Sequence, residues 1–160
     1  MKILITGNSG CGKSTQAKKI AKLLNYRVIH LDDIVWDNGK KRDGALRKEI
    51  LSSYLNTEEN QVFEGSSHSE WMHELYSTVD IVILLKPPII LSKYRIVKRY
   101  VKKKLRLEKG HEETLKYVKK LFKIFDEYEQ NVIPEIINNP LIKYKLRIVT
   151  NDRKTYKLFV

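Results

Sequence analysis

Cysteine is nearly absent from the 160-residue sequence, since Cys11 is its only occurrence. An intramolecular disulfide is therefore excluded, which is typical of proteins from a reducing compartment, and we expect a cytoplasmic protein. Long apolar runs are also missing, because no stretch approaches the roughly 20 consecutive apolar residues of a membrane-spanning helix. The apolar run at the N-terminus is cut short by glycine, unlike that of a signal peptide. We accordingly expect no membrane partner.

Acidic residues are the scarcer charged type, with 19 Asp and Glu against 31 Lys and Arg and a net charge of +12. This excess favours polyanionic or phosphorylated ligands without choosing among them. The length fits one domain over residues 1–160, and no internal repeat or low-complexity tract divides it.

Short apolar runs alternate with longer segments of helical periodicity along the chain. Strands are predicted at residues 2–6, 27–31, 61–64, 80–85 and 145–150. Helices are predicted at residues 14–24, 45–56, 92–107 and 112–137, and Asp152 is a candidate cap for a short last helix. This alternation predicts an α/β fold, with a five-stranded parallel sheet between helices.

A glycine-rich loop between the first strand and the first helix is the strongest signal. It matches the P-loop pattern of Gly, four residues, Gly, Lys and Ser or Thr. Its residues are Gly7, Asn8, Ser9, Gly10, Cys11, Gly12, Lys13, Ser14 and Thr15. Glycine lets backbone N–H groups approach phosphate oxygens, and the following helix adds its positive dipole end. We expect the loop to bind ATP, with Lys13 on the β- and γ-phosphates and the Ser14 hydroxyl on Mg²⁺.

Carboxylates follow the second and third strands, at the sheet edge where ligands of parallel sheets bind. Asp32 is expected to face inward, as a proton acceptor or a magnesium ligand, and Asp33 outward toward the acceptor. Glu64 and Gly65 are predicted to contact the metal or the substrate. The alternative for each is an ordinary turn or helix cap.

Basic residues dominate the helical hairpin predicted over residues 92–137. Between Ser92 and Lys123 there are thirteen Lys or Arg against three Glu. Arg95 and Arg99 share a helix face and are predicted to stabilise the charge of a transferring phosphoryl group. Three interpretations of this basic hairpin remain: a solvated basic face, a lid over phosphates, or a nucleic-acid-binding surface.

Histidine and serine suggest no other chemistry. The four His residues lack the spacing and the Cys partners of a zinc site, and no Ser–His–acid arrangement is evident. His30 is predicted to be a sheet residue, whereas His68 and His73 are candidates for substrate contact.

These residues resemble the adenylate-kinase-like P-loop kinases. The likeness rests on GNSGCGKST, on the Asp after the second strand and on the spacing of Arg95 and Arg99. A closer resemblance is to the small proteins labelled DNA topology modulation (FlaR-related), through Leu31-Asp32, Trp36 and Glu64-Gly65. The resemblance implies strand order 2-3-1-4-5. Adenylate kinases have a separate lid of strands or a loop, whereas the lid region predicted here is a helical hairpin.

The resemblance also implies that Thr150 to Arg153, including Asn151 and Arg153, wrap the adenine. The residues that recognise AMP in adenylate kinases have no clear match between Asp37 and Arg47. Arg42 and Arg47 are candidates for binding an acceptor phosphate, with ordinary surface charge as the alternative. Trp36 is a candidate for acceptor binding nearby. We therefore expect a kinase acting on a small acceptor, such as a nucleoside or nucleotide. The rival hypothesis is a nucleotide-dependent nucleic-acid-binding or regulatory protein with slow ATPase activity.

Overall fold

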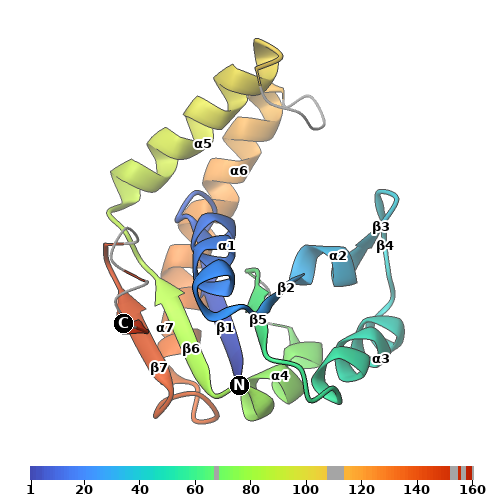
Figure 1. The fold of residues 1–160 in the computed structure, drawn as a ribbon. Coiled ribbons are helices and arrows are strands. Elements are labelled where there is room, and N and C mark those ends of the chain that lie inside the picture. Colours follow the sequence, from blue (N-terminus) through green and yellow to red (C-terminus); the bar gives the residue numbers. More distant parts are fainter. Residues whose placement is uncertain (67–68, 108–113, 152–154, 156–157, 160) are drawn as a thin grey trace.

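A parallel sheet of five strands forms the centre of the computed structural model, which describes residues 1–66, 69–107, 114–151, 155 and 158–159 (Figure 1). The strands are β1 (Lys2–Gly7), β2 (Arg27–His30), β5 (Gln61–Glu64), β6 (Ile81–Leu85) and β7 (Leu146–Val149). Their order is β2-β5-β1-β6-β7, which confirms the predicted order 2-3-1-4-5 of the sheet strands.

The central strand β1 shows why the sheet strands are uninterrupted apolar runs in the sequence. Ile3 of β1 lies opposite Val62 of β5 and Ile81 of β6. Successive side chains of β1 point to opposite faces, and both faces are covered, so the run is apolar without alternation. Ile3, Leu4 and Ile5 are accordingly all fully buried.

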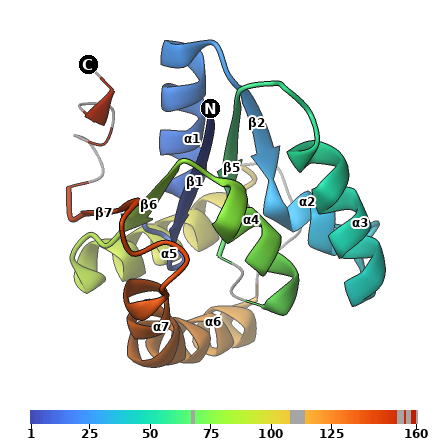
Figure 2. The same cartoon turned by 90° about the horizontal axis from the view of Figure 1, so that it is seen from below.

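Helices cover both faces of the sheet (Figure 2). They are α1 (Lys13–Leu24), α2 (Leu31–Val35), α3 (Gly44–Leu55), α4 (His73–Thr78), α5 (Ile89–Lys104), α6 (Leu115–Glu127) and α7 (Ile133–Asn138), with a 3₁₀ turn η1 (Glu70–Met72). Helix α1 packs Ala17 and Ile20 onto the face that carries Ile3 and Ile5. The opposite face packs against apolar residues of α3, α4 and α7.

Helices α5 and α6 form a hairpin that projects beyond the carboxyl ends of the strands (Figure 1). The hairpin has its own small core, made by Ile96 of α5 with Val118, Leu121 and Phe125 of α6. Arg106, at φ 55°, follows the end of α5. Whether this hairpin acts as a lid stays a prediction.

The helix predicted over residues 112–137 is present over residues 115–138, with a change in its hydrogen-bonding pattern partway along. Helix α6 ends at Glu127, a π-helical turn η2 (Tyr128–Val132) follows, and α7 then begins. Pro134 lies in the first turn of α7. Proline has no N–H to donate, so the regular ladder of hydrogen bonds is interrupted just before it.

A short helix and a small hairpin, neither of them predicted, lie between β2 and α3. Helix α2 begins directly after β2, and strands β3 (Trp36–Asp37) and β4 (Lys40–Lys41) pair antiparallel. Asn38 and Gly39 join them with φ of 46° and 80°. Positive φ at both positions is typical of a type I′ turn, for which Asn-Gly is a strong sequence signal.

Among the described helices, none combines the length and apolar character needed to cross a membrane.

Candidate nucleotide-binding site

The P-loop connects β1 to α1 and is packed tightly against its neighbours. Gly7, Gly10 and Gly12 have φ of 142°, 72° and 99°. A Cβ on Gly7 would lie 2.5 Å from the carbonyl oxygen of Leu85, and a Cβ on Gly10 would lie 2.4 Å from that of Ser92. Both glycines are therefore required by close backbone approach as well as by conformation.

The start of α1 is open to an anion. Gly12 is its N-cap residue, and no side chain caps the first N–H groups of the helix. Such N–H groups need an acceptor, and the helix dipole favours a negative one. The Lys13 ammonium donates to the carbonyl oxygen of Asn8 at 3.0 Å, so it lies across the loop. The loop and its lysine thus have the arrangement that phosphate binding requires.

Asn8 and Cys11, both predicted to contact the nucleotide, are buried. The Asn8 amide donates to the carbonyl oxygen of Phe125 at 2.8 Å and to Glu129 Oε1 at 2.9 Å. Its side-chain oxygen accepts from the N–H of Ser9 at 2.7 Å. Cys11 packs into the core beneath α1. Their side chains therefore brace the loop, and the contacts they would make with a phosphate are through the backbone.

Carboxylates form the wall opposite the loop in a cavity of about 330 Å³. Its lining consists of Ser9, Gly10, Gly12, Lys13, Ser14, Thr15, Asp32, Glu64, Ser66, Arg95 and Arg99. Asp32 comes from the first turn of α2, not from the end of a strand. Glu64 is the last residue of β5. Asp32, predicted to face inward, and Glu64, predicted to contact the metal or the substrate, thus line the same cavity as the P-loop.

Desolvation at the cavity wall raises the pKa of Asp32, and the negative charge of Glu64 adds to this effect. Lys13 acts in the opposite direction and lowers the pKa of Asp32. A carboxylate with a raised pKa is a better proton acceptor near neutral pH.

Glu64 is the centre of a polar cluster that the sequence did not reveal. The Ser14 hydroxyl donates to Glu64 Oε1 at 3.1 Å, and His30 Nδ1 lies 2.5 Å from the same oxygen. His30 and Glu64 are register partners in the parallel strands β2 and β5. His30 was predicted to be only a sheet residue. Ser66, also missed, lines the cavity and donates to the carbonyl oxygen of Gly7 at 2.8 Å.

The donor set fits a magnesium ion. Ser14, Asp32 and Glu64 present oxygen atoms to one cavity, and Mg²⁺ prefers oxygen ligands. No group of three or more acidic, His or Cys side chains able to hold a metal occurs within the described ranges. A magnesium ion here would accordingly depend on phosphate oxygens and water as well as on the protein, which is usual for nucleotide-bound Mg²⁺.

Arg95 and Arg99 reach the cavity from α5. The Arg95 guanidinium donates to the carbonyl oxygens of Gly10 and Cys11, each at 3.4 Å. Three cationic side chains therefore line this cavity, one from α1 and two from α5. The shared helix face predicted for the two arginines is turned toward the P-loop.

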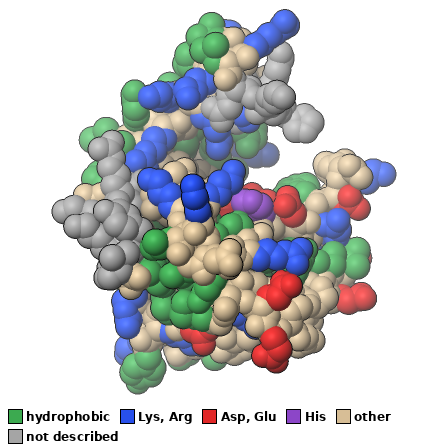
Figure 3. All heavy atoms as spheres, in the orientation of Figure 1, with side chains coloured by type: hydrophobic (Ala, Val, Ile, Leu, Met, Phe, Trp, Pro, Cys, Tyr) green, Lys and Arg blue, Asp and Glu red, His purple; other side chains and the backbone are tan. Residues whose placement is uncertain are grey.

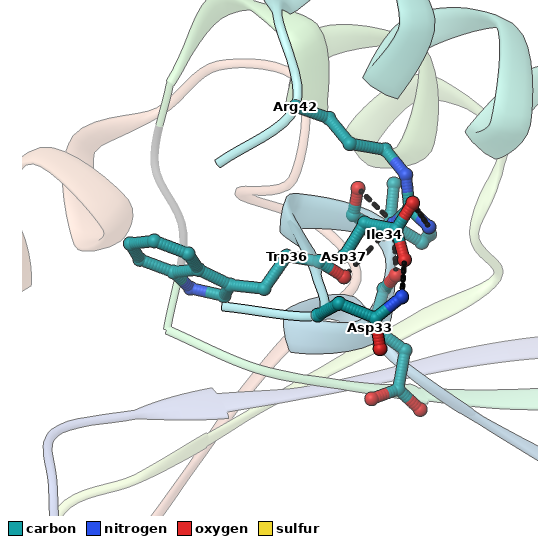
Figure 4. Close-up of polar contacts among 6 residues, drawn as sticks. Asp33, Ile34, Trp36, Asp37 and Arg42 are labelled. Atoms are coloured by element: carbon teal, nitrogen blue, oxygen red, sulfur yellow. Dashed lines mark hydrogen bonds and ion pairs between the residues drawn. The ribbon is translucent and has the colours of Figure 1, made fainter. Parts of the chain in front are cut away.

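The residues predicted for acceptor binding lie outside this cavity. Arg42 Nη1 donates to the carbonyl oxygens of Asp33, Ile34 and Trp36 at 2.6, 3.3 and 3.0 Å (Figure 4). Its Nη2 lies 3.5 Å from Asp37 Oδ2. Arg42 thus ties the end of α2 to the β3–β4 hairpin, a structural role that the sequence did not indicate.

Asp33 faces a separate cavity of about 310 Å³, which Arg42 also lines. Trp36 is exposed, and its indole extends away from Arg42 (Figure 4). Gly65 packs on Leu31, because a Cβ there would lie 2.7 Å from the Leu31 Cβ. A role of these residues in acceptor binding stays a prediction.

Asn151 is exposed just beyond β7, at the edge where the adenine was predicted. Arg153, Asp152 and His68 lie outside the described residues.

Replacing Arg42 with alanine is expected to lower the free energy of unfolding by about 1–3 kcal/mol, because three carbonyl oxygens lose a charged donor. Denaturant unfolding measures the change. Arg27→Ala is the control, since its exposed ion pair with Glu59 contributes less than about 1 kcal/mol. Equal effects of the two substitutions would contradict the structural role of Arg42.

A parallel sheet in this order, with a GxxxxGKS loop between β1 and α1, defines the fold of the P-loop small-molecule kinases. Among solved structures, a shikimate kinase from Bacteroides thetaiotaomicron matches with a TM-score of 0.62 at 18% identity, covering 95% of this chain and 87% of that one. A deoxyadenosine kinase from M. mycoides, with dCMP and dCDP bound, matches at 0.52 and 22% identity, covering 99% and 96%.

A similar sequence is that of a Pyrococcus abyssi protein named "Putative adenylate kinase". It is 33% identical over an alignment of 114 residues, and the alignment covers 66% of this chain and 59% of the relative. No protein-family model matches the chain. The chain is therefore similar in sequence and in fold to P-loop kinases, and the predicted fold class is confirmed.

Proposed function

We propose that the chain transfers the γ-phosphoryl group of ATP to a small acceptor, with Mg²⁺ as the cofactor. The observation that carries the proposal is the single cavity that holds the P-loop lysine, two carboxylates and two arginines. The sequence similarity to the Pyrococcus abyssi protein supports an adenylate-kinase-like reaction. The acceptor is a nucleoside, a nucleotide or another small molecule with a hydroxyl or phosphate group.

In this reaction the acceptor oxygen attacks the γ-phosphorus, and the bond from that phosphorus to the β–γ bridging oxygen breaks to release ADP. Lys13, Arg95 and Arg99 stabilise the charge that spreads over the transferring group. A Mg²⁺ ion, held by phosphate oxygens with Ser14 and Asp32 or Glu64, would neutralise further charge. For a hydroxyl acceptor, the Asp32 carboxylate accepts the released proton. A phosphate acceptor, already ionised, needs no such base.

We further propose that, among the P-loop kinases, the chain is most similar to the FlaR-related topology modulation proteins. This similarity rests on Leu31-Asp32, Trp36 and Glu64-Gly65. A second candidate function, nucleotide-dependent binding of nucleic acid, is favoured by the lysines of the α5–α6 hairpin.

The test is ADP release from Mg·ATP with a panel of nucleosides, nucleoside monophosphates and small metabolites, each with and without DNA. Strong stimulation by one small acceptor, indifferent to DNA, is the expected result. Slow hydrolysis that only DNA stimulates, together with DNA affinity that falls steeply with salt, would favour the second candidate.

Asp32→Asn is expected to lower turnover with a hydroxyl acceptor by about 10²–10⁴-fold, as loss of a general base does.

The same variant should unfold at a higher temperature at neutral pH. The pKa of Asp32 is raised in the folded state, so the folded protein binds the proton more tightly than the unfolded chain. Stability is therefore highest below the unfolded pKa and falls as pH rises through the folded pKa. Asparagine removes that charge.

Rates and thermal unfolding measured on the same preparations check both effects. Unchanged turnover with a hydroxyl acceptor would remove Asp32 from the mechanism. A lower unfolding temperature at neutral pH would show that its charge stabilises the fold.

A further inference from the structure

The outer face of α5 carries a row of apolar side chains in contact with solvent. Ile90, Tyr94, Val97, Val101 and Leu105 are 84%, 58%, 40%, 45% and 62% exposed. Their spacing of four, three, four and four residues aligns them along one side of the helix. This row, here called the α5 stripe, runs the full length of a 16-residue helix. It is a continuous surface, unlike the single exposed apolar residues that any protein shows.

The other faces of α5 contact the P-loop and α6 or line the candidate nucleotide cavity. Ser92 and Ile96 are buried, the first against Gly10 of the P-loop and the second against α6. Arg95 and Arg99 line the nucleotide cavity. The α5 stripe therefore belongs neither to the core nor to the candidate active site.

Lysines border the α5 stripe on both sides. At about 100° per residue, Lys93 and Lys104 lie along one edge and Lys98 and Lys102 along the other. Helix α5 contains no acidic residue. Lys93 forms an ion pair with Asp126 of α6 at 2.6 Å. Figure 3 shows hydrophobic and basic side chains together along the upper left edge, over α5.

Few occupants provide what this surface needs, which is an apolar contact in the centre and negative charge at both edges. A second copy would place two rows of lysine against each other, and like charges repel. A nucleic acid would pair with the lysines but leave the five apolar side chains without an apolar partner. An acidic bilayer satisfies both needs, because acyl chains accept the stripe and headgroups accept the ammonium groups at its edges.

We propose that α5 docks along the surface of an anionic lipid bilayer. The α5 stripe lies in the boundary between headgroups and acyl chains, and Lys98, Lys102 and Lys104 extend toward lipid phosphates and carboxylates. The expectation of no membrane partner rested on the absence of a spanning segment. Peripheral docking through one amphipathic helix needs no such segment.

Co-sedimentation of the full chain with vesicles tests the proposal. Mixed phosphatidylcholine and phosphatidylserine vesicles, in a ratio of about 2:1, are compared with pure phosphatidylcholine. The expected result is binding to the mixed vesicles alone, weakened by added salt. The double variants Val101→Gln/Leu105→Gln and Lys98→Gln/Lys102→Gln should each bind at least about tenfold more weakly. Glutamine keeps helix propensity, so the fold is retained.

Leu23→Gln is the matched control, because Leu23 is an equally exposed apolar residue on α1. It should bind vesicles as the unchanged chain does, and circular dichroism should be the same for all variants. The proposal is overturned if mixed vesicles do not bind at low salt, or if the Val101→Gln/Leu105→Gln variant binds normally. It is also overturned if that variant instead converts a dimer to a monomer, or if DNA binds through the lysines while vesicles do not.

Discussion

Replacing Lys13 with alanine is expected to lower phosphoryl transfer by at least about 10²–10³-fold, as loss of one preorganised positive group does. The Lys13 ammonium lies over the P-loop, 3.0 Å from the carbonyl oxygen of Asn8, in the cavity that the arginines share. Its charge acts on phosphate oxygens, and its stem carries little of the core. We therefore expect unchanged circular dichroism and an unfolding temperature within a few degrees of the original. ADP release at saturating Mg·ATP and acceptor measures the loss.

Lys18→Ala is the matched control for this prediction. Lys18 lies on the same helix but is exposed to solvent. It should retain full turnover. If Lys13→Ala retained turnover as well, the P-loop assignment would fail, whatever the acceptor proved to be.

Gly10→Ala is expected to destabilise the fold and to abolish nucleotide binding together. At φ 72° the methyl group is strained, which costs about 1–2 kcal/mol. It would also lie 2.4 Å from the carbonyl oxygen of Ser92 and 3.1 Å from Ile96 Cγ1, and such overpacking costs about 1–3 kcal/mol more. Denaturant unfolding and titration with Mg·ATP measure the two effects.

Substitutions of two other glycines distinguish backbone strain from overpacking as the cause of the destabilisation. Gly39 has φ 80° but no atom within 4 Å of an added Cβ, so Gly39→Ala should show the backbone strain alone. Gly44 also has open space and begins helix α3, where alanine should stabilise by up to about 0.5–1 kcal/mol. If Gly10→Ala cost no more than Gly39→Ala, the close packing of α5 on the P-loop would be contradicted.

The P-loop and the sheet were predictable because their signals are local. The motif spans nine consecutive residues, and each buried strand is an apolar run bounded by turn residues. Resemblance to known kinases then supplied the strand order. The inward position of Asp32 was also predictable, since ligand-binding residues gather beyond the carboxyl ends of parallel strands.

The contacts made across the chain were not predictable in this way. His30 and Glu64 meet only because β2 and β5 are in register, and Ser14 joins them from a third element. Arg42 lies in a polar stretch of the sequence that is typical of the surface, yet its side chain holds α2 and the β3–β4 hairpin together. Pairings over such distances depend on tertiary packing, which residue types alone do not encode. Pro134 is the sequence signal for the π-helical turn within the second long helix, because proline has no N–H to donate.

The attachment of Asn8 to α6 limits how the α5–α6 hairpin can move. Its amide is bonded to the carbonyl oxygen of Phe125 and to Glu129, while Gly10 lies against Ser92 at the root of α5. The roots of both helices are thus fastened to the phosphate-binding loop itself. A rigid-body rotation of the hairpin about its base would break these contacts with the P-loop. A motion that keeps them would have to bend the two helices farther from the loop.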